Sequence, residues 1–255
     1  MKEDSVYRQS DTSKNTRMKN AIVIGATSGI GKGLAMSLAE NGYKVGITGR
    51  RTRLLEDLKS ENVNSYYIKS FDVTDTKAAV KKLEELTSEL GGLDLLIICS
   101  GAGEINDKLD FEAEKQTIDT NVVGFTCIAD WTFNYFEEQK SGHFAAISSI
   151  GGLRGNRQAP SYNATKAYQI NYLEGLRQKA KRLNGSIIIT DIRPGFVDTA
   201  MAKGAGLFWV MPADKVVRQI YKAIIKKKKV IYVTKRWRFI AAILKLLPNS
   251  IYEKM

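Results

Sequence analysis

The chain has 255 residues, of which 44% are hydrophobic and 26% are charged, proportions typical of a globular protein. This length is enough for one large domain, and no apolar run approaches the roughly 20 residues that a membrane-spanning helix needs. The net charge is +12, and much of the excess lies in residues 221–239. These basic residues are not set in a recognised nucleic-acid-binding motif, so we expect no nucleic-acid partner.

The two ends of the chain differ from its middle. Residues 1–18 are polar and lack the apolar stretch of a signal peptide, so we expect a flexible tail there, on a cytoplasmic protein. One folded domain is expected over residues 19–234, followed by a basic extension over 235–255. Cys99 and Cys127 form no metal-spaced pair, and the single His143 is expected to be structural. We therefore expect reduced thiols and no metal site.

Short apolar runs alternate with amphipathic stretches along the domain. The runs typical of strands are residues 21–25, 44–49, 65–71, 94–100, 142–149, 186–192 and 230–234. The stretches typical of helices are residues 30–41, 51–60, 76–90, 111–138, 161–183 and 213–228. Strands that are apolar on both faces and joined by helices predict a parallel sheet covered on both sides. The expected fold is therefore α/β, a doubly wound Rossmann-type sheet in a three-layer αβα sandwich.

The first predicted strand ends in the sequence IGATSGIGKG. Gly25, Gly29 and Gly31 permit a tight turn close to a phosphate, and the helix that follows offers its free N–H groups to that anion. A Walker phosphate loop is excluded, because it requires other residues where the chain has Ala26 and Gly33. At the first strand of an α/β chain, this turn predicts a dinucleotide site and not a plain strand-to-helix connection.

The end of the second predicted strand indicates which dinucleotide binds. An acidic residue there would bind the ribose hydroxyls of NAD, but Gly49 is followed by Arg50, Arg51 and Arg53. A guanidinium binds phosphate in a forked geometry, which suits the 2′-phosphate of NADP. A solvated basic helix start is the competing interpretation, although a helix N-terminus disfavours positive charge. We therefore expect NADP(H) in preference to NAD(H).

The segment YNATKAY places Tyr162 and Lys166 one helical turn apart. Such a pair is common on ordinary surface helices, so its spacing alone does not indicate chemistry. A free tyrosine, with a pKa near 10, is poorly matched to proton transfer at neutral pH. A lysine ammonium on the same helix face favours the phenolate and lowers that pKa. The pair therefore predicts a general acid/base, Tyr162, that is tuned by Lys166.

Taken in order, the motifs resemble those of the short-chain dehydrogenase/reductase family from about residue 19 to residue 233. These motifs are GATSGIG, FDVTD, CSGAG, NVVG, ISSIGG, YNATK and RPGFVDT. Each is modest alone, but together they are specific. One departure is visible before Gly101, where Ile98, Cys99 and Ser100 stand in place of the family's asparagines. We expect from it a local change and not a loss of activity.

The resemblance implies roles for particular residues. Tyr162 is the general acid/base, and Lys166 also holds the nicotinamide ribose. Ser149 binds the substrate oxygen, and Asn121 places a water that links Lys166 to solvent. The spacing does not favour the neighbouring Ser148. The residues implied to contact the cofactor are Gly25, Thr27, Ser28, Gly29, Ile30, Gly31, Arg50, Arg51, Asp72, Val73, Gly101, Asn121, Tyr162, Lys166, Pro194, Gly195, Val197 and Thr199.

The region after Thr199 corresponds to the substrate lid of the family. Its large apolar side chains are Met201, Leu207, Phe208, Trp209, Val210 and Met211. Flexible and aromatic side chains suit an apolar substrate surface, although a buried helix fits the same pattern. We expect an apolar, lipid-like carbonyl compound or alcohol, with Arg157 or Gln158 as candidates at the rim.

Residues 235–255 extend beyond the family pattern. Apolar residues from Trp237 to Leu247 lie beside basic ones there, which predicts an amphipathic helix that ends at Pro248. The basic residues are Lys235, Arg236, Arg238 and Lys245. Three roles fit this helix: contact with an anionic membrane surface, contact within an oligomer, or packing on its own subunit.

The sequence as a whole favours an NADP(H)-dependent oxidoreductase that interconverts a carbonyl and a secondary alcohol. The alternatives are a catalytically silent NADP(H)-binding regulator and a membrane-surface adaptor that acts through the basic extension. An intact set of catalytic residues argues against the regulator. Because members of the family commonly pair through the helices predicted at 111–138 and 161–183, the resemblance also implies a homodimer or homotetramer.

Overall fold

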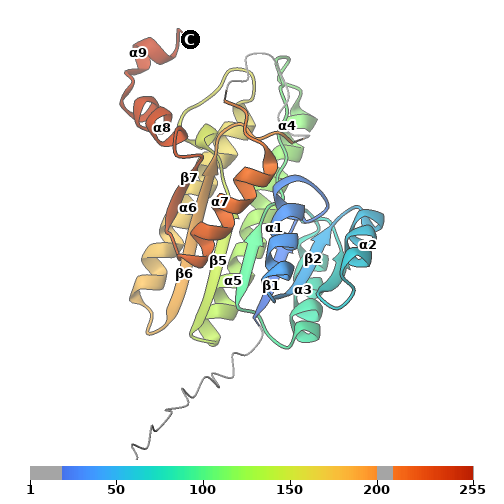
Figure 1. Ribbon diagram of the computed structural model, residues 1–255. Helices are drawn as coiled ribbons and strands as arrows, with labels where there is room; N and C mark the ends of the chain where they lie inside the picture. The colour runs from blue at the N-terminus through green and yellow to red at the C-terminus, as the bar shows by residue number, and fades with distance from the viewer. Residues whose placement is uncertain (1–18, 200–208, 255) are drawn as a thin grey trace, which may run out of the picture.

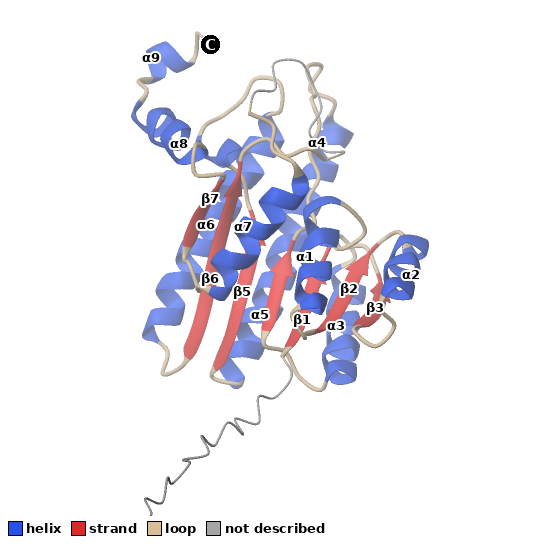
Figure 2. Ribbon diagram, in the orientation of Figure 1, coloured by secondary structure: helices blue, strands red, loops and turns tan. Residues whose placement is uncertain are grey.

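The computed structural model describes residues 19–199 and 209–254, and its centre is one parallel sheet (Figures 1 and 2). The strands of the described chain are β1 (Asn20–Ile24), β2 (Lys44–Gly49), β3 (Tyr66–Ser70), β4 (Leu95–Ile98), β5 (Ser141–Ile147), β6 (Ser186–Pro194) and β7 (Val230–Val233). Their order across the sheet is β3-β2-β1-β4-β5-β6-β7, and every neighbouring pair is parallel. Each strand predicted from the sequence is present, within two residues at either end.

Helices cover both faces of this sheet (Figure 1). Helices α1 (Gly29–Glu40), α2 (Thr52–Glu61) and α7 (Ala213–Ile225) lie on one face, and α3 (Thr76–Leu90), α5 (Phe125–Glu138) and α6 (Pro160–Arg182) lie on the other. The short α4 (Phe111–Ile118) leads into α5, while α8 (Trp237–Leu246) and α9 (Asn249–Tyr252) follow β7 at the carboxyl end of the sheet. The three-layer Rossmann-type sandwich expected from the sequence is confirmed. Among the described residues, no helix combines the length and apolar character that crossing a membrane requires.

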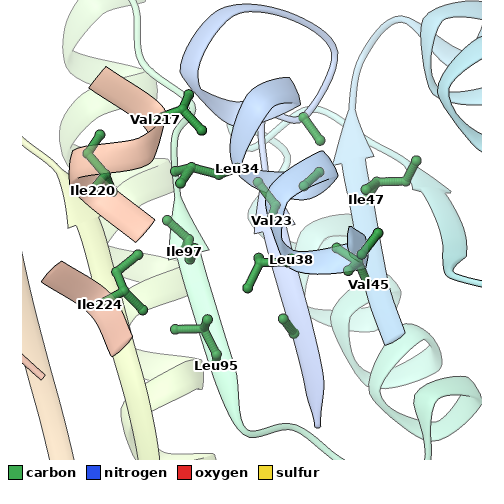
Figure 3. Packing of buried hydrophobic residues seen from close by; sticks show 14 of the residues in the cluster. Val23, Leu34, Leu38, Val45, Ile47, Leu95, Ile97, Val217, Ile220 and Ile224 are labelled. Carbon is green, nitrogen blue, oxygen red and sulfur yellow. The ribbon is translucent and has the colours of Figure 1, made fainter. Parts of the chain in front are cut away.

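Two apolar layers hold the helices on the sheet. Along β1, Ala21 and Val23 face the layer under α1 and α7, and Ile22 and Ile24 face the layer under α3 and α5. Figure 3 shows the first layer, where side chains of α1 and α7 meet above β1 and β4. Because β1 is fully buried on both sides, its run of aliphatic residues is the pattern of a central parallel strand.

The strand order places the polar motifs together. Strand β1 lies between β2 and β4. The chain first adds β2 and β3 on one side of β1 and then adds β4 to β7 on its other side. In open α/β sheets, ligands bind at such a switch point, beyond the carboxyl ends of the strands. The glycine turn, the arginines after β2, the 99–103 segment, Ser149 and Gly195 all follow strands at this edge.

Two helical regions differ from the sequence prediction. The single helix expected over 111–138 is divided into α4, a π-helical turn η1 (Asp119–Gly124) and α5. This wider turn contains Asn121 and brings Gly124 against the Val73 carbonyl, where a Cβ would lie 2.6 Å from that oxygen. A π-turn inside an α-helix often marks a functional position. In the basic extension, α8 ends before Pro248 as the sequence predicted, but a second short helix, α9, follows that was not predicted.

Candidate active site

The glycine turn after β1 is held against two neighbouring strands. Gly25 has φ of +86°, which favours glycine, and a Cβ there would lie 2.7 Å from the Ser100 nitrogen. The backbone nitrogens of Gly25 and Ala26 both donate to the Thr48 carbonyl, at 3.0 and 2.8 Å. A Cβ at Gly31 would overlap the Gly25 carbonyl. The turn therefore brings the first turn of α1, with its unbonded N–H groups, to the edge of the sheet.

Arg51 reaches from the end of β2 back to this turn. Its Nη2 donates to the Thr27 hydroxyl at 2.6 Å and to the Ser28 hydroxyl at 2.9 Å. The sequence predicted Thr27, Ser28 and Arg51 as parts of one site, and the structure brings them together. Arg51 is exposed, and its bonds to Thr27 and Ser28 hold the guanidinium beside the N-terminus of α1, where an anion would bind.

Arg50 points instead toward the end of β3. Its Nη1 lies 3.4 Å from a carboxylate oxygen of Asp72. Burial works to raise the pKa of Asp72, but hydrogen bonds from Thr74 and the charge of Arg50 together hold that pKa below its ordinary value. The carboxyl group of Asp72 is therefore ionised at neutral pH, and the next residue, Val73, is buried.

Asn121 clamps the segment that follows β4. Its Oδ1 accepts from the Ala102 nitrogen at 2.9 Å, and its Nδ2 donates to the Ala102 carbonyl at 2.6 Å and to the Thr165 hydroxyl at 3.0 Å. A Cβ at Gly101 would lie 3.5 Å from Nζ of Lys166. The substitution of the family's asparagines thus leaves this segment bonded to Asn121 and close to Lys166.

Ser149 and Tyr162 meet beyond the carboxyl end of β5. Ser149 caps the short 3₁₀ helix η2 (Ile150–Leu153), where its Oγ accepts from the Gly151 nitrogen at 3.0 Å. Tyr162 lies in the first turn of α6, which begins at Pro160. Its ring and the Ser149 hydroxyl approach each other at Gly151, where a Cβ would lie 3.3 Å from Ser149 Oγ and 3.5 Å from a ring carbon of Tyr162. The backbone of Gly103 lies against the tyrosine ring so closely that no Cβ would fit.

The pKa of Tyr162 differs from the sequence expectation. Burial raises it above the ordinary value, and the nearby Ser149 hydroxyl acts on the pKa in the opposite direction. The charge of Lys166 does not outweigh this burial: its Nζ lies 5.8 Å from the ring centre and donates its hydrogen bonds to other groups. Burial lowers the pKa of Lys166 to about 8, against the opposing charge of Asp191.

Lys166 is 4% exposed, and the protein bonds its ammonium group twice. Nζ donates to the Ile147 carbonyl at 3.0 Å and to Oε1 of Gln169 at 2.9 Å. Gln169 was not predicted as a site residue, although a polar residue at i+3 of Lys166 on a helix was a visible signal. Asn163 was not predicted either; its Nδ2 donates to the Gly151 carbonyl at 2.7 Å and so links η2 to α6.

The segment after β6 returns to the glycine turn. The Gly195 nitrogen donates to the Val233 carbonyl at 2.9 Å, and Val197 bridges to Met211. A Cβ at Gly29 would lie 3.3 Å from the side chain of Thr199. Of the predicted residues Pro194, Gly195, Val197 and Thr199, Thr199 thus approaches the first turn of α1.

Ser148 has a structural role, in agreement with its spacing. Its hydroxyl donates to buried Asp191 at 2.5 Å, and Asp191 forms an ion pair with Arg193 at 2.6 Å. Removing one member of such a buried network leaves an uncompensated charge, so these residues support the sheet beneath the site.

Two apolar residues of the predicted lid, Trp209 and Val210, are among the described residues. Trp209 and Val210 are 48% and 39% exposed, and Trp209 packs edge-on against Trp237. Met201, Leu207 and Phe208 lie outside the described residues. Arg157 and Gln158 are exposed, and the Gln158 carbonyl accepts from the Asn106 nitrogen.

The extension after β7 is fastened beside this region. Nη1 of Arg154 donates to the Leu247 carbonyl at 2.9 Å, its Nη2 donates to the Asn249 side chain at 2.9 Å, and its guanidinium lies 4.3 Å from the centre of the Tyr252 ring. Because Arg154 directly follows η2, the extension is anchored at the end of the short helix that Ser149 caps. Trp237 and Ala241 of α8 are buried. Packing on the same subunit, one of the three roles left open by the sequence, is therefore observed for these two residues.

Comparisons with known proteins agree with this geometry. The sequence profile of the family described as short chain dehydrogenase matches residues 19–207. The chain belongs to that family of oxidoreductases. It is 30% identical over 243 residues to an uncharacterized oxidoreductase of Myxococcus xanthus (strain DK1622), covering 92% of this chain and 95% of that protein.

A second relative has a named activity. It is the 3-oxoacyl-[acyl-carrier-protein] reductase FabG of Staphylococcus aureus (strain Mu50 / ATCC 700699), 34% identical over 195 residues, with 72% of this chain and 76% of the reductase covered. Among solved structures, ElxO with NADP bound has a TM-score of 0.75 at 22% identity, covering 85% of this chain and 97% of that one. A variant of actinorhodin polyketide ketoreductase with NADPH has a TM-score of 0.75 at 20% identity, covering 85% and 95%. These two likenesses show a shared fold.

Proposed function

We propose that this short chain dehydrogenase uses NADP(H) to reduce a carbonyl group on an apolar, lipid-like compound, and oxidises the alcohol in the reverse direction. The observation that carries the proposal is the meeting of Ser149 and Tyr162 at the carboxyl edge of the sheet, with Lys166 one turn along α6. This geometry supplies an oxygen-binding hydroxyl, a proton donor and a nearby cation.

The residues around the glycine turn fit a dinucleotide. Gly25 and Gly31 sit where side chains would collide, the N-terminus of α1 is open, and Arg51 lies beside it. We assign the phosphates to this turn and a 2′-phosphate to Arg51, with Arg50 nearby. The ribose and nicotinamide would be held by the remaining predicted contacts from Asn121, Lys166 and the 194–199 segment. When bound, NADP(H) supplies or accepts the hydride.

The chain's own groups would handle the oxygen and its proton. Ser149 donates a hydrogen bond to the carbonyl oxygen and keeps it within reach of Tyr162. Tyr162 gives its phenolic proton to that oxygen as negative charge develops there. Lys166 favours the resulting phenolate through its charge. The low solvent access of Lys166 strengthens this interaction relative to water.

The apolar character of the substrate is supported by Trp209 and Val210, which expose large apolar surface near the site. The named reductase relative acts on 3-oxoacyl groups, and its likeness favours a carbonyl on an acyl-type chain. The guanidinium of Arg236 also lies near Trp209, 6.0 Å from the centre of its ring.

The direct test follows NADPH absorbance with carbonyl compounds that range from small and polar to long and apolar. Oxidation that prefers apolar ketones supports the proposal. Tyr162→Phe removes only the hydroxyl, so it should lower turnover by about 10²-fold or more and leave NADPH binding intact. Tight NADPH binding without turnover on any ketone would instead favour the silent regulator.

We further propose a homodimer or homotetramer formed through the long helices. Phe111, Ile118 and Val123 on α4 and η1 are 70%, 41% and 46% exposed, which leaves apolar surface for a second copy. Light scattering tests this at micromolar concentration, where a clean monomer would contradict it.

The extension supports a peripheral contact between a cytoplasmic enzyme and a membrane. Phe239, Ile243 and Leu246 are 75%, 55% and 83% exposed, and their spacing puts them in one stripe along α8. Arg238 and Lys245 flank the stripe and are also exposed. An apolar stripe with basic neighbours suits an anionic lipid surface. Because Arg154 holds the extension beside the site, a lipid-like substrate would pass directly from the membrane to the site.

A further inference from the structure

Gln169 joins two residues of the catalytic group. It lies on α6, three positions after Lys166, and is 1% exposed. Its Oε1 accepts from Nζ of Lys166 at 2.9 Å, and its Nε2 donates to the backbone carbonyl of Asn121 at 2.9 Å. The amide therefore spans the interval between the lysine and the π-helical turn.

The partners fix the orientation of this amide. An ammonium group only donates and a carbonyl only accepts, so the oxygen must face Lys166 and the nitrogen must face Asn121. In the reverse orientation, the amide NH₂ would face the Lys166 ammonium, donor against donor, and the amide oxygen would face the Asn121 carbonyl, acceptor against acceptor. At full burial, either mismatch is costly, and the side chain has a single stable position.

The neutrality of the Gln169 amide matters as much as its position. In the described residues, no carboxylate lies within ion-pair distance of Lys166. The ionisable groups that influence Lys166 are Asp191 and the Cys99 thiol, with Tyr162 on the same helix. Asp191 is engaged by Arg193, and burial raises the pKa of Cys99 to about 12, so that thiol is uncharged.

We infer that Gln169 is a positioning residue that stabilises Lys166 as a cation next to Tyr162 without adding a counter-charge. A carboxylate at the same place would form an ion pair and cancel the field of the ammonium at the phenol. An apolar side chain would leave the buried ammonium short of a hydrogen bond. The neutral amide does neither, so the positive charge stays available to favour the phenolate.

Gln169 adds a second link between Asn121 and Lys166. The sequence predicted that Asn121 would place a water linking Lys166 to solvent, and the structure in addition joins the Asn121 carbonyl to Lys166 through the Gln169 side chain. A water passes a proton by exchanging one, but an amide nitrogen does not release its proton near neutral pH. The branch through Gln169 therefore holds Lys166 and conducts no proton.

The test measures the protonation of Lys166 directly. Protein labelled with carbon-13 at the Cε of lysine is titrated by NMR, and the Lys166 signal is identified by its absence in Lys166→Arg. In the wild type this signal should titrate near the pKa of about 8 that burial gives Lys166. Gln169→Glu should raise the midpoint by about one unit or more, and Gln169→Met, of similar shape, should lower it by about one unit.

Gln178→Glu is the matched control, because it makes the same change at an exposed position of the same helix. It should leave the midpoint unchanged. In a second readout, the pH profile of kcat/KM in Gln169→Glu should shift upward at the limb assigned to Tyr162, since the cancelled charge no longer favours the phenolate. Loss of stability alone would not move a titration midpoint in opposite directions in two variants.

Three results would overturn the inference. Midpoints that coincide with the wild type in both folded variants would show that Gln169 does not act through Lys166. Shifts of the same sign in both would show a general disturbance of the site. Failure of both variants to fold would assign the amide to stability alone. The inference rests on the proposed function in naming Tyr162 as the group served, but the lysine titration needs no substrate, so it stands apart from any failure to find carbonyl turnover.

Discussion

The indole of Trp237 lies directly against the backbone of Gly195. A Cβ on Gly195 would overlap the indole ring, and the ring also packs edge-on against Phe196, with 5.5 Å between centres. Gly195 belongs to the segment proposed to close over the cofactor, and Trp237 opens α8. Trp237, a residue of the extension that is 2% exposed, thus supports the segment proposed to close over the cofactor.

This contact predicts the effect of Gly195→Ala. The new methyl group must displace the indole, and such overpacking costs about 1–3 kcal/mol of the free energy of unfolding. Because the shift moves the 194–199 segment, NADPH binding should weaken as well. Urea unfolding and NADPH fluorescence measure the two effects.

Gly175→Ala is the matched control for that change. A Cβ there meets nothing within 4 Å, and the position is helical, so alanine should be neutral or stabilising. Unaltered stability and binding in Gly195→Ala would show that the indole moves aside freely.

The fold was predictable because its signals are local. Buried parallel strands such as Ala21–Ile24 need apolar side chains on both faces, and that requirement is visible in four consecutive residues. The positions of Gly25, Ser149 and Tyr162 followed from motifs that stand at strand ends or helix starts. The π-helical turn at 119–124 was missed because the periodicity of the flanking helices continues through it.

The contacts within the site were less predictable, because they depend on tertiary distances. Lys166 has the spacing to approach Tyr162, but the direction of its ammonium group is set by the Ile147 carbonyl and Gln169. The anchoring role of Arg154 depends on an extension about 90 residues later in the chain. No pattern in one segment reveals a partner at that separation.

Arg51 should determine the choice between the two dinucleotides. Arg51→Ala removes a guanidinium proposed to bind the 2′-phosphate, and a charge-assisted bond of this kind is worth about 1.5–3 kcal/mol. The KM for NADPH should therefore rise by roughly 10- to 100-fold, while the KM for NADH changes little. The comparison is its own control, since loss of the bonds to Thr27 and Ser28 affects both dinucleotides. An equal rise in both KM values would assign Arg51 to loop structure.

His143 should make the stability of the protein depend on pH. Burial lowers its pKa from 6.5 to about 4, and its Nε2 lies 2.8 Å from the Thr190 hydroxyl. That hydroxyl donates to the Lys228 carbonyl, so Nε2 of the neutral ring is the donor. The unfolded chain binds a proton below pH 6.5 and the folded chain does not, so stability is full above pH 6.5 and falls as the pH drops toward 4.

The loss over that window amounts to about 3 kcal/mol at most, at 1.36 kcal/mol per unit. Urea unfolding at a series of pH values measures it. His143→Gln keeps a donor near Thr190 but has no charge to gain, so the difference between the two curves isolates the histidine from the carboxylates. Parallel curves would mean that the ring is hydrated or protonated in the folded protein.

The exposed stripe of α8 should bind anionic vesicles. Replacing Phe239 and Leu246 together by serine removes two apolar side chains, each worth about 1.5–3 kcal/mol on burial, so co-sedimentation with phosphatidylglycerol vesicles should fall by more than tenfold. Binding should also weaken with salt and be slight on phosphatidylcholine, because Arg238 and Lys245 act through charge. Ala242→Ser on the same helix is the control and should bind as the wild type does. Both substituted side chains point away from buried Trp237, so folding and turnover on a water-dispersed ketone should persist. If the wild type ignores vesicles and the double variant instead changes mass in light scattering, α8 is a contact between subunits and the membrane proposal fails.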